Sequence, residues 1–256
     1  MINYNRYILR KKEVITLNEI LGILSSQDEI NIYVETLRKF GNLSLLAVCI
    51  IAYAYGAVIL IKRKAPFFAS MPMMGILCEA MRCLFVFSCI WSTDYYPQGY
   101  NTASLSNVAV FLLLSGTAMG LKATGRKKSA KILPVIVAAL PILPLIYVCT
   151  YPDHIISQNV QCAIMTAAVC LCVFVNFRLI LTPDTDGNKV SSFRPYFILV
   201  IVYCVAALTE MTVLCAYPWG VAVCHNILLI VSYLVQCVSY LLMPLLIAKG
   251  VDKWKT

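Results

Sequence analysis

Charged side chains are scarce in this chain, at 13% of 256 residues. A soluble globular domain carries about a quarter charged residues, so the composition excludes an ordinary soluble protein. Hydrophobic residues instead make up 61% of the chain, and the mean hydropathy is +0.80. They are gathered into runs of about 20 residues, the length that crosses a bilayer as a helix. The sequence therefore predicts an integral membrane protein with no large soluble domain.

Histidine is almost absent, with only His154 and His225, and none of the 12 cysteines forms a CxxC pair. Zinc and haem sites need such ligands at short spacing, so we expect no metal and no cofactor. Most of the cysteines fall inside apolar runs, where cysteine behaves as a small hydrophobic residue. A disulfide stays open for the cysteines near the predicted outer ends of the runs, which are Cys89, Cys149, Cys162, Cys215 and Cys224.

Familiar catalytic and nucleotide-binding motifs are absent as well. The chain has no Gly-rich nucleotide loop, no HExxH and no GxSxG, so it shows none of the common sequence signatures of catalysis. Its N-terminal residues are polar and charged, and they lack the apolar core of a secretory signal peptide. Clues to function must therefore be sought within the apolar runs.

Seven apolar runs are long enough to span a bilayer. Each must be helical, because lipid offers no partner to a bare backbone N–H or C=O. The sequence thus predicts an all-α polytopic membrane helix bundle of about seven transmembrane helices. We place the transmembrane domain at 43–248, after an amphipathic helical segment at 1–42 and before a short basic tail at 249–256. The predicted spans are 43–61, 71–91, 105–121, 132–149, 160–181, 195–216 and 221–248.

Lysine and arginine are confined to alternate loops between these spans. They follow spans 1, 3, 5 and 7, whereas the loops after spans 2, 4 and 6 contain none. Positively charged loops face the cytoplasm, so we expect a multi-pass protein of the cell membrane with its N-terminus outside and its C-terminus cytoplasmic. Basic residues within 1–42 disagree, and a miscounted or re-entrant segment there is the alternative. The net charge of +9 reflects this topology and attraction to the lipid bilayer, and we expect no nucleic-acid partner.

Two capping boxes stand in the first forty residues, Thr16-Leu-Asn-Glu19 and Ser26-Gln-Asp-Glu29. In each box the hydroxyl accepts from a backbone amide of the first turn, while the glutamate reaches back to the cap residue. Each box predicts a short amphipathic helix, and Gly41-Asn42 predicts the end of the second. The apolar face within 16–40 suits the membrane surface, and docking of a protein partner is the alternative.

Three ionisable residues lie deep within the predicted spans: Glu79, Arg82 and Glu210. Such a residue costs roughly 2.5–3.5 kcal/mol on insertion scales, so each is a candidate functional group. Glu79 and Arg82 are three residues apart and project from one helix face, where they can form an ion pair. Glu210 has no basic residue within a helical turn, so either it is protonated because burial disfavours its charge or it finds a partner on another helix, for which Arg82 is the natural candidate. The three side chains then either clamp the helices together or line a polar cavity.

Further polar residues are candidates for the same cavity. Gln236 lies in the last span, and His225-Asn226 lies near its outer end. With the three ionisable residues they complete our set of candidate ligand-binding or proton-linked residues, for a small molecule or an ion. Ser115 and Thr117 of span 3 are secondary candidates, since each alone more often forms an interhelical hydrogen bond.

Three classes of function fit these features. A transporter or permease component that binds or moves a small solute accounts for the charges within the spans and for the prolines of span 4 (Pro134, Pro141 and Pro144), because discontinuous helices often border transport sites. A membrane sensor that acts through a protein partner is the first alternative. An intramembrane enzyme on a lipid or isoprenoid substrate is the second, and would use Glu79 or Glu210 as its proton donor.

Overall fold

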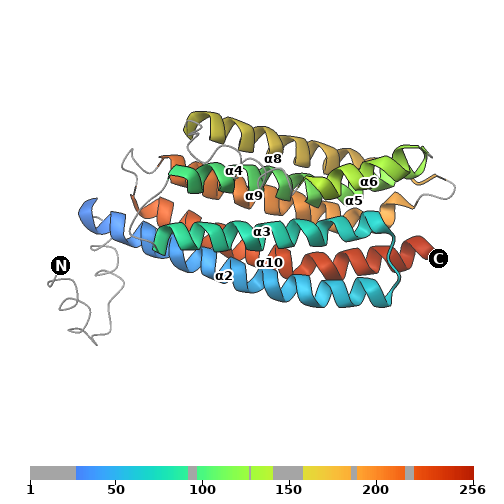
Figure 1. Cartoon of the computed structure of the whole chain (residues 1–256), viewed down its shortest axis with the longest axis horizontal. Coiled ribbons are helices and arrows are strands. Elements are labelled where there is room, and N and C mark those ends of the chain that lie inside the picture. Colours follow the sequence, from blue (N-terminus) through green and yellow to red (C-terminus); the bar gives the residue numbers. More distant parts are fainter. Residues whose placement is uncertain (1–26, 92–96, 127, 141–157, 186–188, 217–221) are drawn as a thin grey trace.

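The computed structural model describes residues 27–91, 97–126, 128–140, 158–185, 189–216 and 222–256. These residues form helices and no β-strand, and the helices lie side by side along one long axis (Figure 1). The elements are α2 (Gln27–Lys62), α3 (Phe67–Trp91), α4 (Pro97–Leu114), α5 (Gly116–Thr124), α6 (Ser129–Ala139), α8 (Gln158–Ile180), the 3₁₀ helix η2 (Val190–Phe193), α9 (Arg194–Ala216) and α10 (Ala222–Lys255).

Five helical segments in the described part of the chain are long and apolar enough to cross a membrane. They lie in α2, α3, α8, η2 continued by α9, and α10. A sixth span results if α4 and α5, which are bent by 43° relative to each other, count as one. The predicted span at 132–149 is described only in part, within the 11-residue helix α6. The all-helical architecture with several helices of membrane length is confirmed, whereas the count of seven stays a prediction.

Large apolar side chains cover the outside of the bundle. Ile51 and Ile61 on α2 are 57% and 76% exposed, and Phe174 on α8 and Leu234 on α10 are 61% and 60% exposed. Soluble monomers rarely expose contiguous apolar patches larger than a few hundred Å². This surface is therefore suited to contact with lipid, as expected of a multi-pass membrane protein.

Six helical units make a closed ring of contacts. Helix α2 contacts α3, which contacts α4, and α4 contacts α8; α8 then contacts α9, α9 contacts α10, and α10 returns to α2. The ring therefore joins the first and the last described helices, which run in the same direction (Figure 1). Tyr196, Tyr203 and Tyr240 are among the largest side chains that are fully buried within it.

Helix α2 is a single helix of 36 residues, about 54 Å long at 1.5 Å per residue. The hydrocarbon core of a bilayer is about 30 Å thick, so α2 is long enough to extend well beyond it. The helix end expected at Gly41-Asn42 is wrong. The Tyr233 ring of α10 packs directly on Gly41, where a Cβ atom would lie 2.4 Å from the ring Cε2. The glycine therefore permits close helix packing and does not end the helix.

The third predicted span is interrupted at Ser115, between α4 and α5. The Tyr196 hydroxyl of α9 donates to the Leu114 carbonyl at this break. Asn176 of α8 donates its side-chain amide to Ser115 Oγ at 3.2 Å. Side chains of neighbouring helices thus supply hydrogen bonds where the helical ladder is broken, which is the condition for a bend at membrane depth.

Two glycines of α5 bring this helix close to α3. A Cβ atom at Gly116 would lie 2.5 Å from Met71 Cβ, and one at Gly120 would lie 2.2 Å from Phe68 Cβ. The two glycines are four residues apart, the spacing that lets two membrane helices approach closely. Helix α5 therefore packs on the start of α3 through a GxxxG surface.

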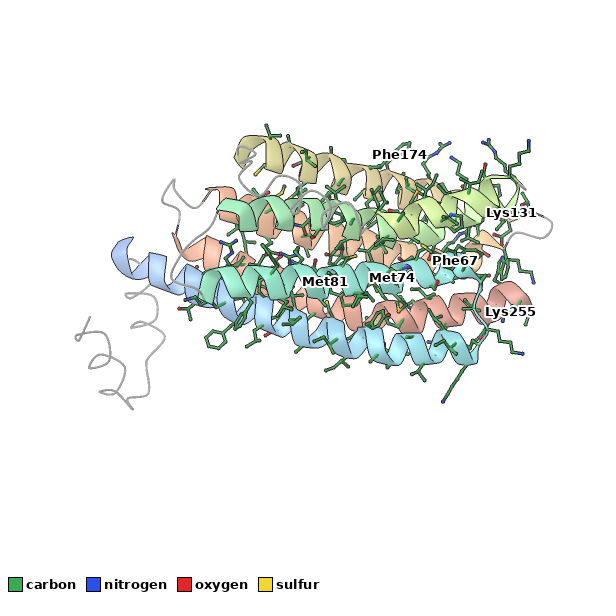
Figure 2. All side chains as sticks on the ribbon, viewed as in Figure 1. Phe67, Met74, Met81, Lys131, Phe174 and Lys255 are labelled. Atoms are coloured by element: carbon green, nitrogen blue, oxygen red, sulfur yellow. The ribbon has the colours of Figure 1, made fainter. Side chains whose placement is uncertain are left out.

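The basic residues expected in the cytoplasm gather at one end of the bundle, where Figure 2 labels Lys131 and Lys255. Helix α10 continues to Lys255 without a break at 248, and its last turn packs on the body of the protein. The Trp254 and Phe68 rings meet edge to face at 5.5 Å, and Lys255 Nζ donates to the Lys64 carbonyl at 3.0 Å. The expected tail is thus part of α10, and the boundaries placed at 42 and 248 fall within continuous helices.

Candidate functional site

Glu79 and Arg82 form an ion pair on α3, as their spacing predicts. Arg82 Nε donates to Glu79 Oε2 at 2.8 Å, and Arg82 Nη2 donates to Oε1 at 2.5 Å. Glu79 is fully buried and Arg82 is 8% exposed. The two parallel bonds give the bidentate geometry in which a guanidinium binds a carboxylate most strongly. Each charge therefore offsets much of the desolvation cost of the other.

Glu210 lies buried on α9, and its contacts come from α10. Gln236 Nε2 donates to Glu210 Oε2 at 2.7 Å and to Ser232 Oγ at 3.1 Å. The Ser232 hydroxyl in turn donates to the Ala206 carbonyl at 2.6 Å. A chain of hydrogen bonds thus ties the Glu210 carboxylate to the α9–α10 interface.

The expected direct contact between Glu210 and Arg82 is wrong. Arg82 already binds both oxygens of Glu79 on its own helix, and the local pair requires no particular arrangement of other helices. Glu210 lies near enough for its charge to interact with Arg82 through space. The nearest groups that bind Glu210 directly are neutral ones.

Tyr233 connects Glu210 to α2. Its hydroxyl interacts with the Glu210 carboxylate and accepts a hydrogen bond from Asn42 Nδ2 at 3.4 Å. The same asparagine amide donates to the Arg38 carbonyl at 2.8 Å. Three helices, α2, α9 and α10, therefore meet in polar contacts around Glu210.

A pair of tyrosines, Tyr203 and Tyr240, interacts with the charge of Glu79. The hydroxyl oxygens of Tyr203 and Tyr240 are 2.5 Å apart, and their rings meet edge to face at 4.9 Å. Both hydroxyls lie within the electric field of the Glu79 carboxylate. The two aromatic rings pack between α9 and α10, and the Tyr240 hydroxyl donates to the Tyr203 hydroxyl.

We call Glu79, Arg82, Glu210, Tyr233 and Gln236 the polar centre. It contains two carboxylates and one guanidinium, so with all three ionised it carries one negative charge in excess. Arg38 on α2 is a further cation, which is half-buried and interacts with Tyr233 through its charge. An excess charge in a low-dielectric interior is costly unless a proton or a cation neutralises it. The polar centre is therefore suited to bind one positive charge.

Asn226 is buried on α10, and neither its Oδ1 nor its Nδ2 has a hydrogen-bond partner among the residues that the structure describes. Buried side-chain amides are nearly always hydrogen-bonded, so both atoms are free to bind a polar ligand. Asn226 lies seven residues, about two helical turns, before Tyr233. His225 is within α10, but its side chain is outside the described part of the structure.

The secondary candidates Ser115 and Thr117 belong to a different cluster. Ser115 Oγ contacts Cys172 Sγ of α8 at 2.9 Å, and Thr117 Oγ1 donates to the Phe68 carbonyl of α3 at 3.2 Å. Asn176, in the last turns of α8, is fully buried here. These side chains stabilise the bend between α4 and α5 and do not join the polar centre.

Reasoning from the sequence missed Tyr233 and Tyr240 as parts of this buried surface. Asn226, Tyr233 and Tyr240 follow one another at intervals of seven residues, which places them on one face of a helix. This repeat of large polar side chains in the last apolar run is the signal that identifies them. It marks the face of α10 that is turned towards the other helices.

The chemistry available to this site is that of carboxylates, amides and hydroxyls. In the regions that the structure describes, no three His, Cys, Asp or Glu side chains are grouped as they would be around a metal ion. No protein-family model matches the chain, and neither a curated protein nor a solved structure matches it. The functional inference therefore rests on the polar centre and on Asn226.

Proposed function

We propose that this protein is a transporter component of the cell membrane that binds a proton or a small cationic solute at Glu210. One observation carries the proposal: the polar centre holds two carboxylates, and of these its single guanidinium binds Glu79 and not Glu210. In the part of the chain that the structure describes, the hydrogen bond to the Glu210 carboxylate comes from a neutral donor, Gln236 Nε2, at 2.7 Å. The charge of Glu210 is therefore the one that a proton or a cation would neutralise.

The partners of Glu210 suit a reversible binding step. In the absence of a cation, the Gln236 amide donates to the carboxylate and the Tyr233 hydroxyl interacts with the same charge, and both reduce the cost of that charge. A side-chain amide has an oxygen acceptor as well as an N–H donor. Rotation of the Gln236 amide would turn its oxygen towards a bound cation beside Glu210. The same two residues can thus serve the empty and the occupied states.

Two helices next to the polar centre, α3 and α10, each contain a proline that favours a bend. Pro72 lies within α3, seven residues before Glu79, and Pro244 lies within α10, eight residues after Gln236. Proline removes a backbone hydrogen bond from a helix and favours a bend there. Gly56 of α2 lies between them, since a Cβ atom there would be 2.5 Å from Met73 Sδ and 2.9 Å from Pro244 Cβ. We call Pro72, Pro244 and Gly56 the proline layer. It supports a hinge between the polar centre and the basic end of the bundle.

The position of Asn226 supports access of a solute to Glu210 from the side of the polar centre opposite Pro244. It lies ten residues before Gln236 on α10, about 15 Å along the helix axis, and away from Pro244. Its unpaired amide offers both a donor and an acceptor to a polar solute that moves towards Glu210. A path that includes Asn226, Glu210 and the proline layer would then follow α10 through the bundle.

Proton flux into liposomes tests the proposal directly. Purified protein is reconstituted with an internal pH dye, and a K⁺ diffusion potential is imposed with valinomycin. We expect acidification well above that of protein-free liposomes and at least a tenfold lower rate for Glu210→Gln. Asp252→Asn, which changes an exposed carboxylate at the end of α10, is the matched control and should keep the rate. If protons do not cross, the same vesicles are assayed with Na⁺, K⁺, choline and spermidine.

The proposal fails if none of these cations crosses faster than in protein-free liposomes. It also fails if Glu210→Gln transports as fast as the unchanged protein. In both outcomes the variants are first shown to be folded by an unchanged elution volume and a cooperative thermal transition in detergent.

A sensor is the second candidate, and one observation favours it. Helix α10 carries Asn226 and Gln236, and its far end is fixed to the α2–α3 turn, where Arg63 and Asp252 are paired at 3.1 Å. A ligand that shifts α10 at its buried polar face would therefore move this surface. Faster hydrogen exchange at 60–66 and 250–255 on ligand binding, without solute flux, would favour the sensor. A protein partner at 16–40 would receive or supply the signal in that case.

We also propose that the basic end of the bundle faces the cytoplasm. The end marked by Lys131 and Lys255 (Figure 2) would then contact the anionic inner leaflet, and the start of α2 would lie outside. A membrane-impermeant amine reagent should label Lys255 in permeabilised cells and spare it in intact ones. Labelling in intact cells would reverse this orientation.

A further inference from the structure

A cavity of about 390 Å³ lies between the end of α5, the turn that follows it and the first turns of α6. Three cationic side chains, Lys122, Arg126 and Lys128, line one part of it. Three apolar side chains from α6, Ile132, Leu133 and Ile136, line another part. The cavity is large enough for a small-molecule ligand, since such sites measure about 300–1,000 Å³.

The charged side chains that line this cavity are all cationic. Its lining residues include the three cations and no aspartate or glutamate. The whole segment between Asp94 and Asp153 contains no acidic residue, so the chain offers no local carboxylate to pair with these side chains. Arg126 and Lys128 sit in the exposed turn between the helices. The cavity therefore favours an anion with two or more oxygen acceptors, such as a phosphate group.

The apolar part of the cavity continues onto the outer surface of α6. Ile132 and Ile136 are 58% and 54% exposed, and Val135 beside them is 64% exposed. These residues lie on a helix that begins at the basic end of the bundle (Figure 2). A ligand with its anionic group at Lys122, Arg126 and Lys128 would thus have an apolar surface beside it that runs along α6.

We propose that this cavity binds one anionic phospholipid, with the phosphate among the three cations and an acyl chain along α6. A free phosphate ion would engage the cations only and would leave Ile132, Leu133 and Ile136 without a contact. A zwitterionic lipid would fill the same surface, but its own positive group would oppose the cationic lining. The site is separate from the polar centre, and it would hold α6 against α5 at the surface of the bilayer.

Native mass spectrometry of the purified full chain in detergent tests the lipid site. The probes are phosphatidylglycerol and phosphatidylcholine with identical acyl chains, together with sodium phosphate and glycerophosphoglycerol, which have no acyl chain. We expect one phosphatidylglycerol to bind at least tenfold more tightly than phosphatidylcholine. The triple variant Lys122→Gln/Arg126→Gln/Lys128→Gln should lose most of this preference, because each cation near the surface attracts anionic lipid.

The matched control is Lys62→Gln/Lys249→Gln/Lys253→Gln, which removes the same charge elsewhere at the basic end. It should keep the binding of phosphatidylglycerol, and both variants should retain the melting temperature of the lipid-free protein. Equal loss in the two variants would overturn the proposal in favour of diffuse attraction. Displacement of the lipid by equimolar sodium phosphate would show a free-anion site instead. Unchanged lipid binding by the first triple variant would also overturn it.

Discussion

Gln236 and Glu210 are joined side chain to side chain across the α9–α10 contact, with 2.7 Å between Nε2 and Oε2. The guanidinium that would neutralise this carboxylate, that of Arg82, is bound to Glu79 on its own helix. The polar centre therefore consists of a self-contained ion pair and of a carboxylate stabilised by neutral donors. The two parts respond differently to substitution.

The ion pair should show strong coupling in a double-mutant cycle. Glu79→Gln and Arg82→Met should each lower the free energy of unfolding by about 3–5 kcal/mol, because each strands a buried charge. The double variant should recover most of that loss. Thermal unfolding in detergent measures the three changes, and Met81→Leu, at a half-exposed neighbour on α3, is the control. Unchanged or raised stability in the single variants would mean that the charges are kept for function at a cost in stability.

Asn226 should be dispensable for stability. Both of its amide atoms are buried without a hydrogen-bond partner among the described residues. Burying such an amide lowers the free energy of unfolding by about 1–3 kcal/mol, and Asn226→Leu removes this cost. The melting temperature should stay constant or rise, while the transport rate in the liposome assay should fall. Ser232→Ala is the contrasting variant, since it removes the bond to the Ala206 carbonyl and should lower stability. A clear loss of stability in Asn226→Leu would assign Asn226 a packing role.

Gly120 should tolerate no side chain, whereas Gly125 should accept one. An added Cβ atom at Gly120 would lie 2.2 Å from Phe68 Cβ, while nothing lies within 4 Å of one at Gly125. Gly120→Ala should therefore lower the free energy of unfolding by about 1–3 kcal/mol through overpacking. Gly125→Ala should leave it unchanged or raise it by up to about 1 kcal/mol, because it restricts the unfolded chain. Equal melting temperatures for the two variants would contradict the close contact of α5 with α3.

The hydrogen bonds between Asp184 and Ser191 should break in acid. The Ser191 hydroxyl and the Ser191 backbone amide both donate to the Asp184 carboxylate, the amide at 2.7 Å. These bonds lower the pKa of Asp184 below its ordinary value. The stabilisation is thus present above the unfolded-state pKa of about 3.9 and is lost as pH falls through the lower folded-state pKa. Hydrogen exchange at the Ser191 amide should speed up over that range, beyond its intrinsic pH dependence.

Asp184→Asn should abolish this effect. The asparagine does not titrate near this pH, so the protection of the Ser191 amide should follow only the intrinsic exchange rate. A pH dependence that survives in Asp184→Asn would place the titrating group elsewhere.

Contacts within one helix are predictable from the sequence, and contacts between helices mostly are not. The pairing of Glu79 with Arg82 follows from their spacing, because residues three apart are neighbours on any α-helix. The partner of Glu210 depends on the rotation and depth of α10 relative to α9, which no local pattern specifies. Arg82 is therefore a reasonable but wrong choice, and Gln236 takes its place.

The glycines show the same limit of prediction from the sequence. Gly41 has the sequence context of a helix end, yet it lies in mid-helix because Tyr233 packs on it. The GxxxG spacing of Gly116 and Gly120 is a signal of a helix contact that our reading of the sequence overlooked, and its partner surface on α3 is known only from the structure. The repeat of Asn226, Tyr233 and Tyr240 likewise identifies a buried face without naming what it faces.

The placement of both partners of the ion pair on α3 has a consequence for synthesis. A nascent membrane protein presents its helices to the bilayer in chain order, so α3 enters before α9 and α10 have been made. Because Arg82 neutralises Glu79 within the same helix, α3 can cross as an electrically balanced unit. Glu210 arrives with α9, while its amide donor Gln236 is still to be translated. The contact between α2 and α10 that closes the ring can then form only after α9 has been made, so the polar centre is completed when α10 is in place.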